Sequence, residues 1–411
     1  MATSYATVAP PAPTTLPAKS SQPTYNHAIG YLRALVVVLV VAHHAALAYH
    51  PFAPPPSASL IAQPRWWGAF PVVDPHKWTG AALLVSFNDL FFMSLMFFLS
   101  GLFVWHGLRT KGAAKFLHDR LLRLGMPFVV SVGALAPLAY YPAYLQISGH
   151  TGIGGFLHQW LSLGNWPAGP AWFIAVLLAF DCVAALLFLM LPTWGQKLGA
   201  VTAGAERRPI LFFAALVVLS ALAYMPMAHR FTSLAWTAFG PFAFQTSRIF
   251  HYLLYFLIGV GVGAWGLDRG LLATQGKLAR RWPLWVAASL VVFVVAIAVT
   301  IAAMASWGKS PTLASAADAG FVLSCAASCF SFLSVFLRFA RSRSTVWDGV
   351  AANSYGIYLI HYAVVSWMQY ELVPAALPGI VKWLIVFPGA LMISWALAET
   401  TRLIPAVARV I

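Results

Sequence analysis

The sequence predicts an all-α integral membrane protein, a single bundle of about ten transmembrane helices with both termini in the cytoplasm. Of its 411 residues, 61% are hydrophobic and only 9% are charged, whereas about a quarter of the residues of a soluble domain are charged. Apolar runs long enough to cross a bilayer recur along the chain, and basic residues collect in alternate connections between them. These three observations define the fold class.

The N-terminal tail, residues 1–26, consists mainly of Pro, Ala, Thr and Ser with a single Lys19. Such a composition cannot bury a hydrophobic core, so we expect the tail to be disordered. A cleaved signal peptide is not expected, because a charged n-region is missing and the next apolar segment is too long for an h-region. The membrane domain is therefore predicted to comprise residues 27–405.

The first predicted span, residues 30–49, contains Arg33 and two adjacent histidines. Ionisable groups in an apolar run are costly and therefore mark candidate functional positions. Helical geometry puts His44 within about 20° of the face that carries Arg33, whereas His43 lies about 80° away from it. His44 is also about 16 Å along the axis from Arg33, so we expect it near the middle of a hydrocarbon core about 30 Å thick.

The remaining spans follow a Pro- and Trp-rich connection, about residues 50–82, which we expect at the membrane interface, where tryptophan rings anchor. Pro127, Pro137 and Pro142 all fall in the third span, where neighbouring helices can satisfy the carbonyl groups that prolines leave free. Nine further apolar runs are each near the length of a span: about residues 83–107, 121–146, 170–191, 209–228, 247–266, 284–305, 315–338, 350–370 and 379–403.

The basic residues predict the orientation of the bundle. When successive connections are assigned to alternate sides, 19 of the 25 Lys and Arg residues fall on the side of the N-terminus and 6 on the other. Cytoplasmic connections carry the excess of Lys and Arg, so both termini are expected in the cytoplasm. The net charge of +15 is then a topology signal, and nucleic-acid binding is not expected.

Cysteine and glycine patterns indicate packing within the membrane. Cys182, Cys325 and Cys329 all lie in predicted spans, so we expect neither a disulfide framework nor a metal site. The GxGxG run at residues 259–263 lies inside a span with no preceding strand, and it therefore indicates close helix packing rather than a dinucleotide loop.

Several charged residues are candidates for a site or for structural pairing. Arg120 and Arg123 share one face at the start of a helix, where they could grip phosphates or form a positive-inside cluster that meets anionic lipid. Asp89 and Asp181 are membrane-embedded carboxylates that need a partner, and we expect structural pairing rather than catalysis.

Five segments in order resemble the motifs of acyltransferase family 3, over about residues 26–403. These segments are Arg33 with ten residues before His44, FFLSG at residues 97–101, Asp119-Arg120-Leu-Leu-Arg123 before Pro127, Trp172-Phe173 in GPAWFIAVLL, and the run NSYGIYLIH from Asn353 to His361.

The resemblance implies a ten-helix membrane O-acyltransferase of the bacterial inner membrane that modifies carbohydrates. It implies transfer of an acetyl or succinyl group from cytoplasmic acyl-CoA to a hydroxyl of a cell-surface or periplasmic glycan, which can be lipid-linked. Acetyl-CoA is the expected donor substrate, and no permanently bound cofactor is expected. The expected partners are this donor, the carbohydrate acceptor and the lipid bilayer.

The resemblance also assigns roles to residues. The functional arginine and histidine of the family's opening helix map onto Arg33 and His44, and its paired arginines map onto Arg120 and Arg123 as donor-binding residues. The family often ends its last helix with Glu-x-Pro, which here is Glu399-Thr400-Thr401 without the proline.

Histidine suits acyl transfer because the acceptor hydroxyl must lose a proton near neutral pH. A neutral His44 could act as the base or as a transient acyl carrier, or it could only make a hydrogen bond between helices. His361 follows Tyr358 in the ninth span, also near mid-membrane. His361, Tyr358 and Glu399 are possible pocket residues, and a satisfied core histidine is the other interpretation of His361.

Two other functions fit part of the pattern. A secondary transporter or flippase for a glycan or acyl-group precursor would also place His, Arg and Asp within the membrane, although no inverted repeat is visible. A non-catalytic sensor or scaffold would keep the fold but tolerate the loss of His44.

The orientation can be tested with Lys111→Cys and Trp66→Cys, each in a background that lacks the three native cysteines. An impermeant thiol reagent applied to intact cells should label the cysteine at position 66 and not the one at position 111, because the second connection is expected in the cytoplasm. The reverse pattern would overturn the orientation and the side from which the donor enters.

Overall fold

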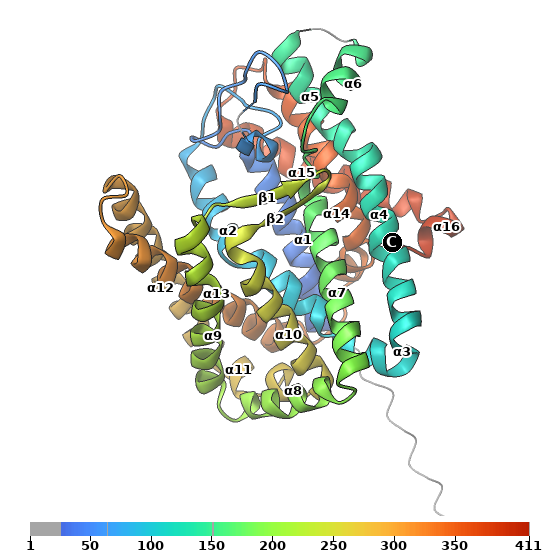
Figure 1. Ribbon diagram of the computed structural model, residues 1–411, viewed down its shortest axis with the longest axis vertical. Coiled ribbons are helices and arrows are strands. Elements are labelled where there is room, and N and C mark those ends of the chain that lie inside the picture. The colour runs from blue at the N-terminus through green and yellow to red at the C-terminus, as the bar shows by residue number, and fades with distance from the viewer. Residues whose placement is uncertain (1–25, 64, 150–151, 411) are drawn as a thin grey trace, which may run out of the picture.

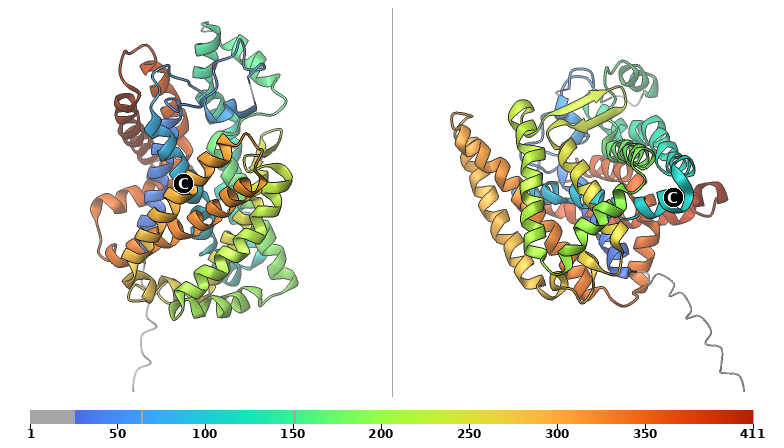
Figure 2. Two further views of the ribbon diagram at one scale, coloured as in Figure 1. Left: turned by 90° about the vertical axis from the view of Figure 1, so that its left-hand side faces the viewer. Right: turned by 60° about the horizontal axis from the view of Figure 1, so that its bottom comes forward.

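Long helices dominate the computed structural model, which describes residues 26–63, 65–149 and 152–410. Within these residues, nine helices are long and apolar enough to cross a membrane, and they form one bundle (Figure 1 and Figure 2). The all-α membrane fold is therefore confirmed. The predicted disordered tail lies outside the described residues except for Asn26. The nine helices are α1 (His27–Leu47), α2 (Thr79–Gly101), the segment Val104–Ser148, Gly169–Met190 with α7 (Trp172–Met190), α9 (Pro209–Phe231), Thr246–Trp265 with α10 (Ile249–Trp265), α12 (Trp282–Ala305), α13 (Pro311–Phe339) and α15 (Gly379–Thr401).

The tenth predicted span, residues 350–370, lies within α14 (Thr345–Leu372). This helix has 28 residues, but it is not among the nine apolar helices, because it carries polar side chains that include Asn353, His361 and Gln369. All three are buried, and α14 packs against α1, α15 and α5 (Ala136–Ser148). The expected helix exists, and its polar face is turned into the bundle rather than toward lipid.

The third span is longer than predicted because the basic segment before it is also helical. α3 (Val104–Arg120), α4 (Met126–Val130) and α5 are joined by two π-helical turns, Leu121–Gly125 and Ser131–Leu135. Each π-turn contains the carbonyl group four residues before a proline, the group with which the proline ring would collide in a regular α-helix. The wider π-turn therefore avoids this collision at Pro127 and at Pro137.

α14 satisfies two of the carbonyl groups that prolines leave without a helical partner. The hydroxyl of Tyr355 donates to the carbonyl oxygen of Arg123 at 2.6 Å, four residues before Pro127. The indole Nε1 of Trp367 donates to the carbonyl oxygen of Leu138 at 3.0 Å, four residues before Pro142. The expectation that neighbouring helices would re-satisfy these groups is confirmed at both positions.

α1 and α14 run parallel and in constant register. The hydroxyl of Tyr31 donates to Asp348 Oδ1 at 2.7 Å, and His44 lies against His361, and both pairs are separated by 317 positions. The register is thus kept over about 20 Å of helix. This direction agrees with a first and a ninth span in an alternating bundle, whereas the side on which the N-terminus lies stays a prediction.

Glycines bring α2 and α10 close together, as the GxGxG run predicted. A Cβ atom on Gly259 would collide with the carbonyl oxygen of Phe98, and one on Gly263 would collide with that of Leu102. A Cβ atom on Gly101 of α2 would in turn collide with the carbonyl oxygen of Phe256. The run therefore serves backbone-to-backbone packing.

Shorter elements connect or flank the long helices, and the sequence did not predict them. The strands β1 and β2 form an antiparallel hairpin in which Trp236 pairs with Gln245. In Figure 1 this hairpin lies in front of α1 and α14. The elements are η1 (Arg65–Ala69), α6 (Ile153–Leu161), η4 (Gly169–Ala171), α8 (Trp194–Ala203), η5 (Gly204–Glu206), β1 (Trp236–Phe239), β2 (Phe242–Gln245), η6 (Thr246–Arg248), η7 (Gly270–Leu272), α11 (Lys277–Arg280) and α16 (Pro405–Ala408).

The glycine contact predicts a large difference between two conservative substitutions. Gly263→Ala should destabilise the protein by about 1–3 kcal/mol. The added methyl group would collide with the backbone carbonyl of Leu102, and a side-chain shift cannot relieve that collision. Gly133→Ala is the matched control, since a Cβ atom there meets nothing within 4 Å. Thermal unfolding of the two variants in detergent measures the effect, and equal melting temperatures would contradict the packing role.

Candidate functional site

Two histidines meet where α1 contacts α14. Nε2 of His361 lies 3.1 Å from Nδ1 of His44, and the ring centroids are 5.0 Å apart. His361 is 0% exposed, whereas His44 is partly exposed between buried neighbours. The structure therefore brings together two of the candidate residues predicted from the sequence, from helices far apart in the chain.

His44 lies near one end of its helix. α1 ends at Leu47, so His44 lies in the last turn, whereas its depth in a membrane stays a prediction. The helix stops because Pro51 follows closely and disfavours helical geometry in the residue before it. The pair thus lies toward the end of α1 that leads into the connection, residues 48–78.

The hydrogen bonds around the pair define which nitrogens carry protons. Nδ1 of His44 is 2.8 Å from the carbonyl oxygen of Val40, and Nδ1 of His361 is 2.7 Å from that of Tyr358. A carbonyl can only accept, so both Nδ1 atoms are protonated. In a neutral ring, Nε2 of His361 is then an acceptor for the Nδ1–H group of His44. The lone pair of His44 Nε2 is left available to react, an assignment that rests on the hydrogen-bond network.

His43 faces a different neighbour, as the helical phase predicted. Its ring stacks on Phe92 of α2 with centroids 5.1 Å apart, and the side chain is buried. It makes no ring contact with His361 among those found in the described residues, while its own contact with His44 is edge-on at 5.3 Å. The two adjacent histidines are therefore distinguishable by substitution.

Side chains of α14 and α15 hold the last turn of α1 in place. Gln369 Nε2 donates to the carbonyl oxygens of His44 and Ala45, both at 3.0 Å. Trp383 Nε1 donates to the carbonyl oxygen of Ala42 at 3.0 Å. The final carbonyl groups of a helix have no partner within it, so the bonds of Gln369 satisfy two of them, and the three bonds together fix the backbone that carries the imidazole of His44.

A small, partly open cavity adjoins the pair. Its walls come from Ser131 to Ala136, from the start of α7 and from the α14 residues Tyr358 and Tyr362. The ring of Tyr362 lies edge-on to His44 with centroids 5.0 Å apart, so this side chain forms the partition between the cavity and the histidine. Tyr358 donates its hydroxyl to the carbonyl oxygen of Pro170. The predicted pocket residue Tyr358 thus does line a cavity.

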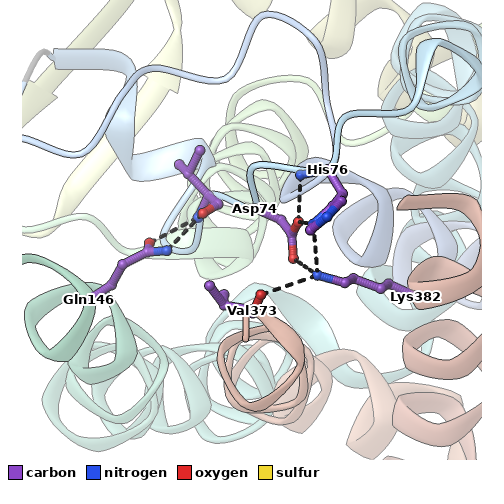
Figure 3. Close-up of polar contacts among 6 residues, drawn as sticks. Asp74, His76, Gln146, Val373 and Lys382 are labelled. Carbon is purple, nitrogen blue, oxygen red and sulfur yellow. Dashed lines mark hydrogen bonds and ion pairs between the residues drawn. The ribbon is translucent and has the colours of Figure 1, made fainter. Parts of the chain in front are cut away.

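The connection between α1 and α2 covers the pair. Its Gly68 carbonyl oxygen accepts from the hydroxyl of Tyr362 at 3.1 Å and from that of Tyr140. A buried ion pair holds the connection down, since Lys382 Nζ of α15 lies 2.6 Å from Asp74 Oδ2 and both side chains are 0% exposed (Figure 3). The connection is therefore packed onto the bundle, although the sequence predicted only a position at the membrane interface.

A family model covers nearly the whole chain. It is that of acyltransferase family 3, described as an acyltransferase domain, and it matches residues 26–399. The chain belongs to this family. No curated protein and no solved structure matches the chain. Together with the apolar helices, membership identifies a multi-pass membrane acyltransferase and supports an acyl donor, a glycan acceptor and a lipid bilayer as its partners.

The paired arginines of this acyltransferase lie in different environments. Nε of Arg120 is 3.1 Å from Asp181 Oδ2 of α7, and the carboxylate is 0% exposed. Arg123 lies in the first π-turn and is exposed. A regular α-helical spacing does not hold between them, because the π-turn begins at Leu121. The expectation of structural pairing for Asp181 agrees with this contact, and Asp89 likewise meets Arg248 Nη2 at 2.7 Å.

Arg33 and Glu399 are not brought against the histidines. Arg33 is exposed on α1, eleven residues before His44. Glu399 is exposed near the end of α15, sixteen residues beyond Trp383, which corresponds to about 24 Å along the helix. The roles of both residues in the acyltransferase stay predictions. No group of three or more His, Cys, Asp or Glu side chains that could hold a metal ion occurs in the described ranges.

Sequence reasoning missed Gln369, Tyr140 and the pair of Asp74 with Lys382. A lysine four residues into an apolar run was a usable signal, because such a residue needs a partner inside the membrane. Gln369 gave a weaker signal, as an amide in the same apolar run eight residues after His361. Tyr140 gave none, since its role depends on a carbonyl group in a distant loop.

The ion pair of Arg120 predicts how its role can be separated from donor binding. Arg120→Leu should destabilise the acyltransferase by about 3–5 kcal/mol, because it leaves the carboxylate of Asp181 buried without a cation. Arg120→Leu combined with Asp181→Leu should recover the melting temperature. Arg123→Leu should leave stability unchanged and raise the KM for acyl-CoA. A double variant that regains stability but keeps a raised KM would show that Arg120 also binds the donor.

Proposed function

We propose that the protein transfers a short acyl group from cytoplasmic acyl-CoA, with acetyl-CoA as the preferred donor, to a hydroxyl of a cell-surface or periplasmic glycan. The bacterial inner membrane is the proposed location. The observation that carries the proposal is the hydrogen-bonded pair of His44 and His361, which leaves Nε2 of His44 free to act, in a chain that belongs to an acyltransferase family.

His44 is the proposed general base. Its Nε2 takes the proton of the acceptor hydroxyl while the hydroxyl oxygen forms a bond to the thioester carbonyl carbon. The tetrahedral intermediate then collapses, the carbon–sulfur bond breaks, and the leaving CoA thiolate takes the proton from the imidazolium. The products are the acylated sugar and CoA, with no net change in the enzyme.

The surroundings of His44 favour the imidazolium that this step creates. Its Nδ1–H group donates to the carbonyl oxygen of Val40 and to Nε2 of His361, and both bonds strengthen when the ring becomes charged. The last turn of a helix also carries the negative end of the helix dipole, which favours a cation. His361 is therefore a proposed positioning residue, which orients the base without touching substrate.

The donor is proposed to bind between Arg33 and Arg123 on one side and the cavity beside Tyr362 on the other. Arg33 and Arg123 are exposed and can meet phosphate groups, since planar guanidinium forks suit them. This small cavity is lined by small and apolar side chains, among them Ala136, Ala171 and Ala363. It suits an uncharged acyl group such as acetyl better than succinyl, because a buried carboxylate would lack a cation there.

The proposal predicts unequal effects of the adjacent histidines. His44→Ala should lower acyl transfer by about 10²–10⁴-fold, the usual contribution of a general acid or base. His43→Ala should cost far less, because that ring packs against Phe92. CoA release from acetyl-CoA in membranes, at matched protein abundance and in the presence of the glycan fraction, measures the difference.

An active His44→Ala protein would rule out the proposed chemistry and leave a transporter or a scaffold as the better interpretation. Equal losses in both variants would show that the whole turn matters for folding rather than His44 for the reaction. Melting temperatures of the purified variants distinguish these outcomes.

A further inference from the structure

A buried lysine and a buried aspartate join the connection, residues 48–78, to α15. Nζ of Lys382 lies 2.6 Å from Asp74 Oδ2 and also donates to the carbonyl oxygen of Val373 at 3.3 Å. Both charged side chains are 0% exposed. The other carboxylate oxygen, Oδ1, accepts from the backbone N–H of His76 at 2.7 Å (Figure 3). The two charges are therefore paired only while the connection lies against α15.

The ion pair lies beside the turn that carries His44. The residue after the lysine, Trp383, donates its indole N–H to the carbonyl oxygen of Ala42 at 3.0 Å. The aspartate donates its backbone N–H to the carbonyl oxygen of Ala48 at 3.0 Å, just beyond the end of α1. The ion pair and its neighbour are thus bonded to the backbone on both sides of the candidate base.

The segment held by the ion pair lies over a side chain that contacts His44. The carbonyl oxygen of Gly68 accepts from the hydroxyl of Tyr362 at 3.1 Å, and the ring of Tyr362 lies edge-on to His44 with centroids 5.0 Å apart. Further along the segment, the backbone nitrogen and oxygen of Val73 bond to the side-chain amide of Gln146 at 3.1 and 2.7 Å (Figure 3). The connection therefore covers the approach to His44 from this end of α1.

Loss of one charge should open this cover. A buried ion that loses its partner is strongly destabilising. Because Asp74 belongs to the connection, lifting the connection is enough to hydrate its carboxylate, and the bundle need not unfold. Removing Lys382 should therefore shift the balance toward the open connection by about 10²–10³-fold. Removing both charges should have no such effect, because no charge then stays buried without a partner.

We propose that Lys382 and Asp74 are positioning residues, which hold the connection over His44 and so make a sugar hydroxyl rather than water the acceptor. Water would give a proton to Nε2 of His44 while its oxygen bonds to the thioester carbonyl carbon. The carbon–sulfur bond then breaks, and the CoA thiolate takes the proton from the imidazolium, which leaves a carboxylic acid and CoA. Excluding water suppresses this side reaction. The inference rests on the proposed function and adds the residues that select the acceptor.

The first test compares Lys382→Met with the double variant Lys382→Met, Asp74→Asn, in which Asn keeps an oxygen that can accept from His76 N–H. Lys115→Met is the matched control, because Lys115 pairs with Asp119 at 2.8 Å but is 61% exposed, and exposed pairs contribute little. Labelled acetyl-CoA gives the ratio of free acetate to acetylated glycan. Lys382→Met should raise this ratio by about 10-fold or more, because the open state becomes more populated. The double variant and the control should keep the wild-type ratio.

Thiol labelling measures the opening without any activity. Val72 is 0% exposed and lies between Gly68 and Asp74, so Val72→Cys places a buried reporter in the connection. In a background that lacks the three native cysteines, a water-soluble maleimide should label the purified protein in detergent slowly. Labelling should be faster when Lys382→Met is added and slow again in the double variant.

Three results would overturn the inference. The first is an equal labelling rate with and without Lys382→Met, which would show that the ion pair does not hold the connection. The second is an unchanged ratio of hydrolysis to transfer despite faster labelling or a lower melting temperature, which would leave the pair a role in stability alone. The third is a double variant as hydrolytic as Lys382→Met, which would exclude the unpaired carboxylate as the cause.

Failure of the proposed function gives a different result. If the wild type releases no more CoA than His44→Ala, the acyltransferase chemistry is wrong and the choice of acceptor falls with it, whereas the labelling rates still differ. If the wild type transfers the acyl group and Lys382→Met keeps its ratio of hydrolysis to transfer, only the role of the ion pair is wrong.

Discussion

Inside a bilayer, backbone groups that a helix leaves unpaired have no water to bond, and they must find partners within the protein. α14 supplies several of these partners. Tyr355 and Trp367 satisfy carbonyl groups that prolines free in the long third helix, and Gln369 satisfies two at the end of α1. The polarity that keeps α14 out of the set of apolar spans is therefore what lets its neighbours contain prolines and end inside the bundle.

The same helix positions the candidate histidines. Because Tyr31 with Asp348 and His44 with His361 keep one register, the position of His361 follows from packing along the whole of α1. Gln369, further along α14, then fixes the turn that carries His44 by donating to its backbone carbonyl groups. A substitution that tilts α14 would therefore disturb the pair of histidines and the proline-containing helix together.

Local periodicity explains which parts of this arrangement the sequence could predict. The spans, the difference in direction between His43 and His44, and the glycine packing near Gly259 all depend on neighbours a few residues apart, and they agree with the structure. The place of His44 in the last turn of α1 was not predicted, because the end of α1 depends on Pro51 and on how the following connection folds. The partner His361 is 317 positions away, and no local pattern specifies such a contact.

The carboxylates in the membrane spans show the same limit: the sequence indicates that each needs a partner, but not which residue that partner is. Hydropathy alone indicated that Asp89 and Asp181 need a partner, and each lies against an arginine, Arg248 and Arg120 respectively. Which arginine serves which carboxylate depends on helix packing, and the result changes the expected donor site. An arginine engaged with a buried carboxylate has less to offer a phosphate, so Arg123 becomes a better candidate than Arg120 for contact with the donor.

The place of His44 in the last turn of α1 bears on how transfer would compete with hydrolysis. A base near the end of its helix is close to the side that leads into the connection, and water could reach the acyl donor there as readily as a sugar. Gly68 and Tyr362 form a cover at this end, and Lys382 holds the covering segment through Asp74. Excluding water from the reacting groups favours the sugar hydroxyl as nucleophile. The buried ion pair would then act on the outcome of the reaction through the cover that it anchors.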